Sequence, residues 1–131
     1  MTVRVAVVGL GKMGLLHASI MNVLKSVELV ALCEKSPLVR RFSRKIIPDV
    51  NIVGDIAKLH GMGLDAICVT TPVPSHMPII RTIYDKKIAK NVFVEKPLVS
   101  SYVEAEKLCD LAKNQGGVNM VGYNRRFSVT F

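Results

Sequence analysis

The residues with the clearest chemical potential are three glycines in the spacing G-x-G-x-x-G: Gly9, Gly11 and Gly14. They directly follow the apolar run Val3–Val8, which predicts a buried strand that turns sharply into a helix. Gly9 permits the tight turn, Gly11 lets the backbone approach a phosphate closely, and Gly14 lets the helix pack on the strand. The helix N-terminus then offers unpaired N–H groups and the positive end of its dipole to an anion. Dinucleotide-binding domains hold a pyrophosphate in this way.

An acidic residue occurs where such a domain needs one. Glu34 lies about 20 residues beyond the last glycine, at the end of the predicted strand Val27–Cys33. A carboxylate at this position accepts hydrogen bonds from ribose hydroxyls and repels a 2′-phosphate, which favours NAD over NADP. Lys35 follows at once and Arg40 is close behind, and both could serve a phosphate. The sequence therefore favours NAD and leaves NADP open.

The elements that must position these residues alternate along the chain. Apolar runs predict strands at 3–8, 27–33, 51–53, 64–70, 91–94 and 117–122. Helices are expected at 13–25, 37–47 and 100–114, with a brief one from Asp55 and another that Ser75 caps. Such alternation predicts an α/β, doubly wound parallel sheet, the Rossmann fold, with strand order 3-2-1-4-5-6 and helices on both faces.

Ligands of such a sheet bind beyond the carboxyl ends of its strands, so the residues directly after each strand are the candidate site residues. Besides the glycine turn and Glu34, three segments stand at such positions. They are T-T-P-V-P-S-H from Thr70 to His76, E-K-P from Glu95 to Pro97, and G-Y-N-R-R-F from Gly122 to Phe127.

With these motifs the sequence resembles the Gfo/Idh/MocA oxidoreductase family, the glucose-fructose oxidoreductase and inositol dehydrogenase group. G-L-G-K-M-G, T-P-V-P-S-H, E-K-P and G-Y-N-R-R-F occur in the order and at the spacing of that family. The resemblance covers essentially the whole chain. E-K-P is the most discriminating motif, because most other dinucleotide-binding folds lack it.

The resemblance implies a role for each of these residues. Glu34 would hold the adenosine ribose and Glu95 would contact the nicotinamide ribose. Lys96 would be the catalytic residue that orients the reacting hydroxyl or carbonyl of the substrate, aimed by a cis Lys96–Pro97 bond. The full expected cofactor-binding set is Gly9, Gly11, Lys12, Met13, Gly14, Glu34, Lys35, Thr70, Thr71, Pro72, His76, Glu95, Lys96, Asn124 and Arg125.

Some of these residues have a plainer interpretation. His76 could be a residue at a helix start with no ligand, and this alternative stays open beside a cofactor contact. Lys96 could be a surface lysine, although its place in E-K-P favours the functional interpretation. Arg125 and Arg126 could be an exposed pair, and the sequence does not separate their roles.

The implied activity is that of an NAD(P)-dependent oxidoreductase. It would transfer a hydride between nicotinamide and a CH–OH carbon of a sugar, inositol or similar polyol. Residues 1–124 are expected to form the NAD(P)-binding domain, and residues 125–131 the start of a crossover to a C-terminal substrate domain that this chain lacks. The chain alone is then expected to bind nucleotide but to be catalytically incomplete, and the full-length protein to be a homo-oligomer. The alternative is a non-catalytic Rossmann module that senses nucleotide or docks a partner.

Charge, hydropathy and cysteine content bear on three other classes of function, which are nucleic-acid binding, membrane association and metal binding. The net charge is +8, and a cluster of basic residues lies between Lys35 and Lys45, but no nucleic-acid-binding motif accompanies it, so nucleic-acid binding is not favoured. No apolar stretch approaches the roughly 20 residues that span a bilayer, and no signal peptide precedes the first strand, which predicts a cytoplasmic protein without a membrane association. The three cysteines lack C-x-x-C spacing, so we expect reduced thiols and no metal site.

Overall fold

The computed structural model describes residues 1–130, and it contains one six-stranded sheet in which every observed pairing is parallel. The strand order β3-β2-β1-β4-β5-β6 confirms the predicted topology. The register places Val5–Val8 of the first strand against Ala66–Val69 of the fourth. The strands are β1 (Val3–Val8), β2 (Val27–Cys33), β3 (Asn51–Val53), β4 (Ala66–Val69), β5 (Asn91–Val94) and β6 (Asn119–Val121).

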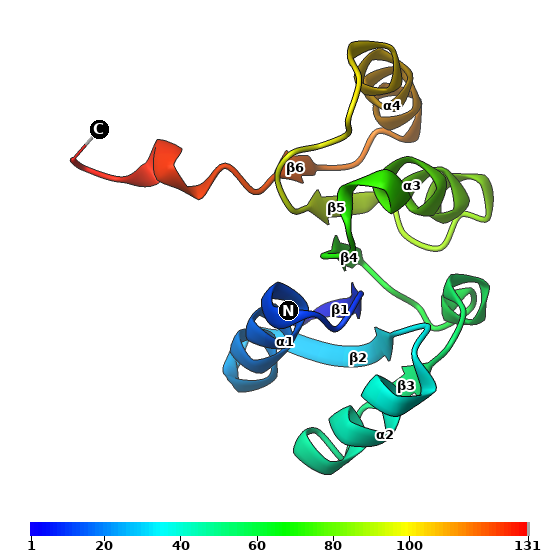
Figure 1. Ribbon diagram of the computed structural model, residues 1–131, viewed down its shortest axis with the longest axis vertical. Coiled ribbons are helices and arrows are strands. Elements are labelled where there is room, and N and C mark those ends of the chain that lie inside the picture. Colours follow the sequence, from blue (N-terminus) through cyan, green and yellow to red (C-terminus); the bar gives the residue numbers. More distant parts are fainter. Residues whose placement is uncertain (131) are drawn as a thin grey trace.

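Helices cover both faces of this sheet (Figure 1). They are α1 (Lys12–Val23), α2 (Pro37–Ile46), α3 (His76–Asp85) and α4 (Tyr102–Gln115), with 3-10 turns at η1 (Ile56–Leu59), η2 (Val73–Ser75) and η3 (Asn124–Phe127). α1 and α2 pack on one face, where Ala18 of α1 and the partly buried Val39 of α2 join one apolar cluster, and α3, α4 and η1 pack on the other. The result is the three-layer arrangement expected of a doubly wound fold.

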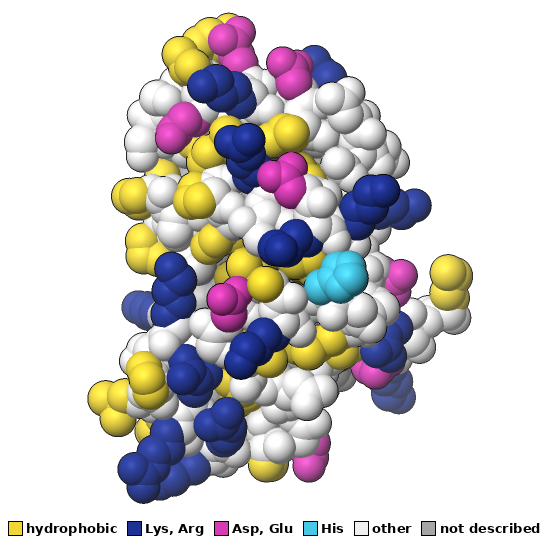
Figure 2. Space-filling model, turned by 90° about the vertical axis from the view of Figure 1, so that its right-hand side faces the viewer, with side chains coloured by type: hydrophobic (Ala, Val, Ile, Leu, Met, Phe, Trp, Pro, Cys, Tyr) yellow, Lys and Arg dark blue, Asp and Glu magenta, His cyan; other side chains and the backbone are white. Residues whose placement is uncertain are grey.

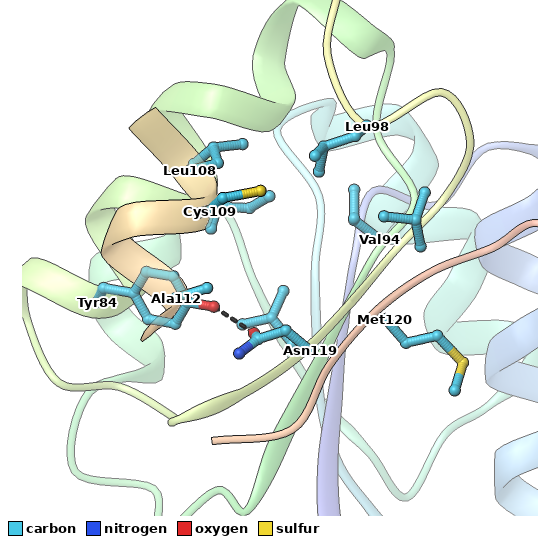
Figure 3. A pocket seen from close by; sticks show the side chains of 11 residues that line it. Tyr84, Val94, Leu98, Leu108, Cys109, Ala112, Asn119 and Met120 are labelled. Atoms are coloured by element: carbon cyan, nitrogen blue, oxygen red, sulfur yellow. Dashed lines mark hydrogen bonds between the residues drawn. The ribbon is translucent and has the colours of Figure 1, made fainter. Parts of the chain in front are cut away.

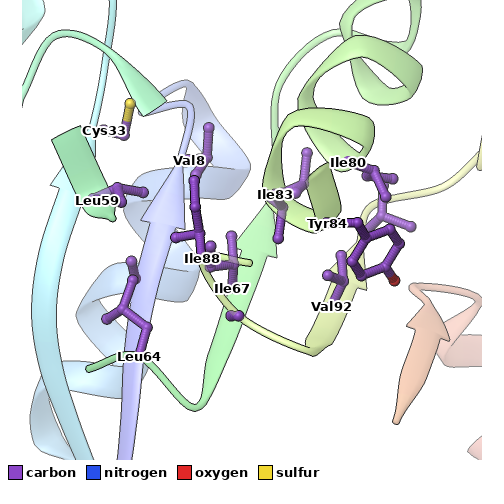
Figure 4. Packing of buried hydrophobic residues seen from close by; sticks show 14 of the residues in the cluster. Val8, Cys33, Leu59, Leu64, Ile67, Ile80, Ile83, Tyr84, Ile88 and Val92 are labelled. Atoms are coloured by element: carbon purple, nitrogen blue, oxygen red, sulfur yellow. The ribbon is translucent and has the colours of Figure 1, made fainter. Parts of the chain in front are cut away.

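The alternation of side chains along each strand builds the two cores. In β4, Ile67 and Val69 point into the cluster beneath α3, whereas Cys68 points into the cluster beneath α1. All three are at most 1% exposed, so β4 is buried on both faces, as parallel strands usually are. Figure 4 shows the larger cluster, in which Ile83 of α3 lies among strand residues such as Val8.

Local side-chain signals define the starts of α2, η1 and α4. Ser36, Asp55 and Ser101 each accept a hydrogen bond from a backbone N–H in the first turn of the following helix, as N-cap residues do. Ser75 was predicted to cap α3, and it does take the N-cap position, but its side chain makes no cap hydrogen bond there. Its hydroxyl oxygen lies 2.6 Å from the Pro72 carbonyl oxygen, because the short turn η2 precedes α3 and draws the side chain backwards.

β6 is shorter than predicted, and the chain then forms η3 at the residues of the G-Y-N-R-R-F motif. Lys and Arg side chains gather at the lower end of the molecule in Figure 2, the end at which Figure 1 shows α2. Within residues 1–130, no helix is long and apolar enough to cross a membrane.

Candidate functional site

The glycine turn between β1 and α1 is so tightly packed that two of its glycines have no room for a side chain. A Cβ atom on Gly14 would lie 1.8 Å from the Gly9 carbonyl oxygen, and one on Gly9 would lie 2.7 Å from Cγ2 of Thr71. Gly9 also has a φ of +91°, in the left-handed region that favours glycine. The hydroxyl of Thr70 lies 2.7 Å from the Gly9 carbonyl oxygen and donates to it. The turn is therefore fixed against the segment that follows β4.

Gly11 differs from the other two glycines because it faces open space. No atom lies within 4 Å of the position that its Cβ would take. Gly11 is the N-cap of α1, no side chain caps this helix end, and its first turn carries no acidic residue. The first N–H groups of a helix have no partner within the helix, so they remain available to an anion. This unblocked helix end, with the exposed Lys12 and Met13 beside it, fits a pyrophosphate.

Glu34 lies against this turn, although it is distant from it in the sequence. The Leu10 backbone N–H donates to Oε2 of Glu34 at 2.8 Å, and the Ser36 N–H donates to Oε1 at 2.8 Å. The end of β2 thus holds a carboxylate beside the glycine turn. At this position the carboxylate can accept hydrogen bonds from the hydroxyls of a ribose. The two backbone donors also orient the carboxylate plane before any ligand binds.

The Arg40 guanidinium contacts the backbone of the loop that carries Glu34. Nη1 of Arg40 donates to the carbonyl oxygens of Glu34 and Lys35, at 2.8 and 2.6 Å. A Cβ on Gly54 would lie 2.9 Å from the same nitrogen, so the guanidinium packs on the backbone after β3. Arg40 therefore shapes the loop after β2, while the Lys35 side chain is exposed at its surface.

The T-P-V-P-S-H segment follows β4 and contains a buried histidine. His76 is 0% exposed, and its Nε2 and Nδ1 lie 2.8 Å from the Thr71 carbonyl oxygen and 2.9 Å from the Leu98 carbonyl oxygen. Both partners are acceptors, so a neutral ring donates to one of them and an imidazolium to both, and in either form the ring lies between the loop after β4 and the loop after β5. The structure thus places His76 between two loops rather than on a surface facing a ligand, whereas Thr71 is partly exposed and Pro72 is exposed.

The E-K-P segment follows β5 and carries the predicted catalytic lysine. The Lys96–Pro97 peptide bond is cis, as the family resemblance implied, and Lys96 is exposed. The backbone N–H of Lys96 donates weakly to Oε2 of Glu95, at 3.3 Å. Asn124 and Arg125 lie in η3, which follows β6, and both are exposed. β5 and β6 are neighbours, so these two segments leave the same edge of the sheet.

Sequence reasoning missed one residue of this edge, His17. Its Nε2 lies 2.8 Å from Oε1 of Glu95, and its ring packs on Phe93 with 5.3 Å between the ring centres. His17 comes from α1, about one helical turn after Gly14. That spacing was the available signal: a histidine one turn into the helix that begins at the glycine turn can reach the neighbouring strand ends.

Burial controls the chemistry of two cysteines. It raises the pKa of the Cys33 thiol from 9.0 to about 11, with the charges of Asp55 and Glu34 adding to the effect. Burial likewise raises the pKa of Cys68 to about 12, with the Glu95 carboxylate contributing. Cys109 is exposed, and all three cysteines are free. The thiols of Cys33 and Cys68 are therefore neutral core groups.

A separate apolar pocket lies between α3, α4, β5 and β6, with Leu98 of the loop after β5 also in its lining (Figure 3). Its volume is about 170 Å³, and its polar groups include the pair Tyr84 and Asn119, in which the phenol donates to the amide oxygen. Burial raises the pKa of Tyr84. The pocket holds no charged side chain, so it does not suit a phosphate-bearing ligand. Among residues 1–130, no group of three or more His, Cys, Asp or Glu side chains is placed to hold a metal ion.

Comparison with known proteins identifies the family. Residues 3–123 match the Gfo/Idh/MocA family, described as an oxidoreductase family with an NAD-binding Rossmann fold. The chain is 33% identical to scyllo-inositol 2-dehydrogenase (NAD(+)) of Bacillus subtilis, over 98% of this chain and 38% of that protein. It is 25% identical to myo-inositol 2-dehydrogenase of Thermotoga maritima, over the same shares of the two chains.

Solved structures agree with this assignment. GenD2 from gentamicin A biosynthesis, in complex with NAD, superposes with a TM-score of 0.87 at 28% identity, over 98% of this chain and 36% of that one. The scyllo-inositol dehydrogenase of Lactobacillus casei with bound NAD(H) and scyllo-inositol gives a TM-score of 0.87 at 22% identity, over 99% and 38% of the chains, which supports the fold. The chain thus spans about 38% of the length of the curated relatives it matches. It belongs to the Gfo/Idh/MocA oxidoreductase family and comprises the NAD-binding Rossmann part.

Proposed function

We propose that this chain is the cofactor-binding part of an oxidoreductase that transfers a hydride between NAD and a CH–OH carbon of an inositol, sugar or similar polyol. The observation that carries the proposal is the open N-terminus of α1 at Gly11, with the Glu34 carboxylate held on the Leu10 N–H beside it. The inositol dehydrogenases among the relatives support the substrate class. The bound dinucleotide would supply the hydride acceptor or donor.

The residues of this chain would bind and orient the reactants. The N–H groups at the start of α1 would hold the pyrophosphate, with Lys12 and Met13 beside it and Thr70 fixing the turn. Glu34 would accept the hydroxyls of the adenosine ribose. Its negative charge would disfavour a 2′-phosphate, and this supports NAD over NADP. Nη1 of Arg40 already donates to two backbone carbonyl oxygens, so this nitrogen is not free to bind a 2′-phosphate.

The nicotinamide end would lie near the segments after β4, β5 and β6. Thr71 and Pro72 would line the middle of the cofactor, and Glu95 would accept a hydroxyl of the nicotinamide ribose. Asn124 and Arg125 would lie at the nicotinamide end. Lys96, exposed at this edge, would donate a hydrogen bond to the reacting oxygen of the substrate and favour its negatively charged form. His76 would hold the two loops together rather than touch the cofactor, because both ring nitrogens face backbone carbonyls.

Calorimetric titration with NAD and with NADP tests the cofactor assignment. We expect NAD to bind at least tenfold more tightly than NADP, and Glu34→Gln to narrow that ratio because it removes the negative charge. Glu28→Gln is the matched control, since Glu28 is an exposed carboxylate of β2 paired with Arg4, away from the turn. Equal affinities in the unaltered chain, or an unchanged ratio in Glu34→Gln, would contradict the role of Glu34.

The main alternative is a Rossmann module that binds nucleotide without chemistry. A chimera in which this chain is joined to the remaining part of the Bacillus subtilis relative separates the two. The enzyme interpretation predicts polyol-dependent reduction of NAD by the chimera, measured at 340 nm. It also predicts that Lys96→Ala abolishes turnover while NAD affinity stays within about twofold. Turnover unaffected by Lys96→Ala would favour the module.

A further inference from the structure

The Glu95 carboxylate is held by a hydrogen bond from His17, whose ring is itself packed against a neighbouring side chain. Nε2 of His17 donates to Oε1 at 2.8 Å, and the pair is largely buried, with the side chains 22% and 16% exposed. The ring of Phe93 packs against the His17 imidazole. On the far side, a Cβ on Gly122 would lie 3.4 Å from Oε2 and 2.9 Å from Cζ of Phe93. The carboxylate therefore has Oε1 occupied by a largely buried hydrogen bond, which fixes its orientation.

The second oxygen remains available. Within residues 1–130, the hydrogen bond that Oε2 receives is the weak one from the Lys96 N–H, at 3.3 Å. A carboxylate oxygen can accept more than one hydrogen bond, so Oε2 has capacity for another donor. The absence of a side chain at Gly122 keeps the space beside this oxygen clear.

We propose that His17 is a positioning residue that presents Oε2 of Glu95 to a hydroxyl of the nicotinamide-side ribose. The inference rests on the proposed function, because it takes that ribose as the partner of Glu95. A glutamate side chain normally loses rotational freedom when it engages a ligand, and that loss weakens binding. In this chain the fold immobilises the carboxylate beforehand, through a hydrogen bond from α1 to β5.

The role predicts a pattern across ligands that contain different parts of the dinucleotide. ADP-ribose retains both riboses, whereas ADP lacks the ribose that Glu95 would contact. We expect His17→Leu to weaken NAD and ADP-ribose by about three- to tenfold, the equivalent of one side chain immobilised on binding, and to leave ADP within about twofold. His17→Gln retains an N–H donor that can reach the carboxylate, so it should recover most of the lost affinity.

Isothermal titration of the whole chain with NAD, ADP-ribose and ADP measures this pattern. His60→Leu is the matched control, because it makes the same change at an exposed histidine after η1 and should alter none of the three affinities. Thermal melts show whether each variant is folded. If His17→Leu does not fold, His17→Phe tests the same pattern, because it keeps an aromatic ring against Phe93 and removes the donor to Glu95.

The outcomes separate this inference from the proposed function. Equal weakening of all three ligands by His17→Leu would mean that His17 supports α1 and the pyrophosphate site, and would overturn the inference. Unchanged affinities in His17→Leu, or failure of His17→Gln to restore binding, would overturn it as well. An unaltered chain that binds neither NAD nor ADP would instead refute the proposed function, and the inference with it.

Discussion

Substituting Gly11 by alanine should separate binding from folding more cleanly than any other change at the glycine turn. The added Cβ meets no protein atom within 4 Å, and the φ of −70° at Gly11 is one that alanine adopts readily. Alanine is a poorer N-cap than glycine, but it also restricts the unfolded chain, and the two effects oppose each other. We therefore expect the free energy of unfolding to change by less than about 0.5 kcal/mol.

The effect of the same methyl group on the cofactor should be much larger. It would occupy the open space at the N-terminus of α1 and prevent the pyrophosphate from reaching one or two backbone N–H groups. Each hydrogen bond to a charged group contributes about 1.5–3 kcal/mol. Loss of one such bond corresponds to an affinity for NAD that is roughly 10- to 150-fold weaker. Calorimetric titration measures the affinity, and urea denaturation followed by circular dichroism measures the stability.

Gly14→Ala is the contrasting variant. Its Cβ would lie 1.8 Å from the Gly9 carbonyl oxygen, which is backbone and cannot rotate away. We expect a loss of about 3 kcal/mol of stability or more, with any loss of binding secondary to it. The reasoning would be refuted if Gly11→Ala bound NAD as tightly as the unaltered chain, or if Gly11→Ala were as unstable as Gly14→Ala.

Three further predictions concern the cysteines and His76. Burial raises the pKa values of Cys33 and Cys68 from 9.0 to about 11 and about 12. The free energy of unfolding should therefore be fully retained below pH 9 and should fall as the pH rises towards 12, by up to about 1.4 kcal/mol per pH unit for each thiol. Urea denaturation at several pH values measures this, and a free energy of unfolding that does not change with pH would contradict it. Iodoacetamide at neutral pH should modify the exposed Cys109 alone in the folded chain, and all three cysteines in urea, as mass spectrometry would show. His76→Leu should cost about 2–4 kcal/mol of stability, because the Thr71 and Leu98 carbonyls lose their buried donor; a melting temperature equal to that of the unaltered chain would rule out this role.

The local pattern of the sequence was sufficient to predict the order of the elements and the place of the glycine turn. The predicted strand order, the start of α2 at Pro37 and the position of β5 agree with the structure. Such features depend on residues that are close in the sequence: apolar runs, cap residues and glycines at fixed spacing. The absent cap hydrogen bond at Ser75 shows the limit, because two successive turns compete for the same hydroxyl and only the backbone path decides between them.

The candidate site, too, could be predicted from the sequence only in part. Its residue types were evident from the sequence, since the segments after the strands had to meet at one edge of a parallel sheet. Their partners were not. His17 and Glu95 are 78 positions apart, His76 reaches a carbonyl 22 positions away, and Glu34 accepts from an amide 24 positions before it. A sequence determines which groups each segment carries. Hydrogen bonds between segments depend on the positions of donor and acceptor atoms to within a few tenths of an ångström. The packing of the helices on the sheet sets those positions.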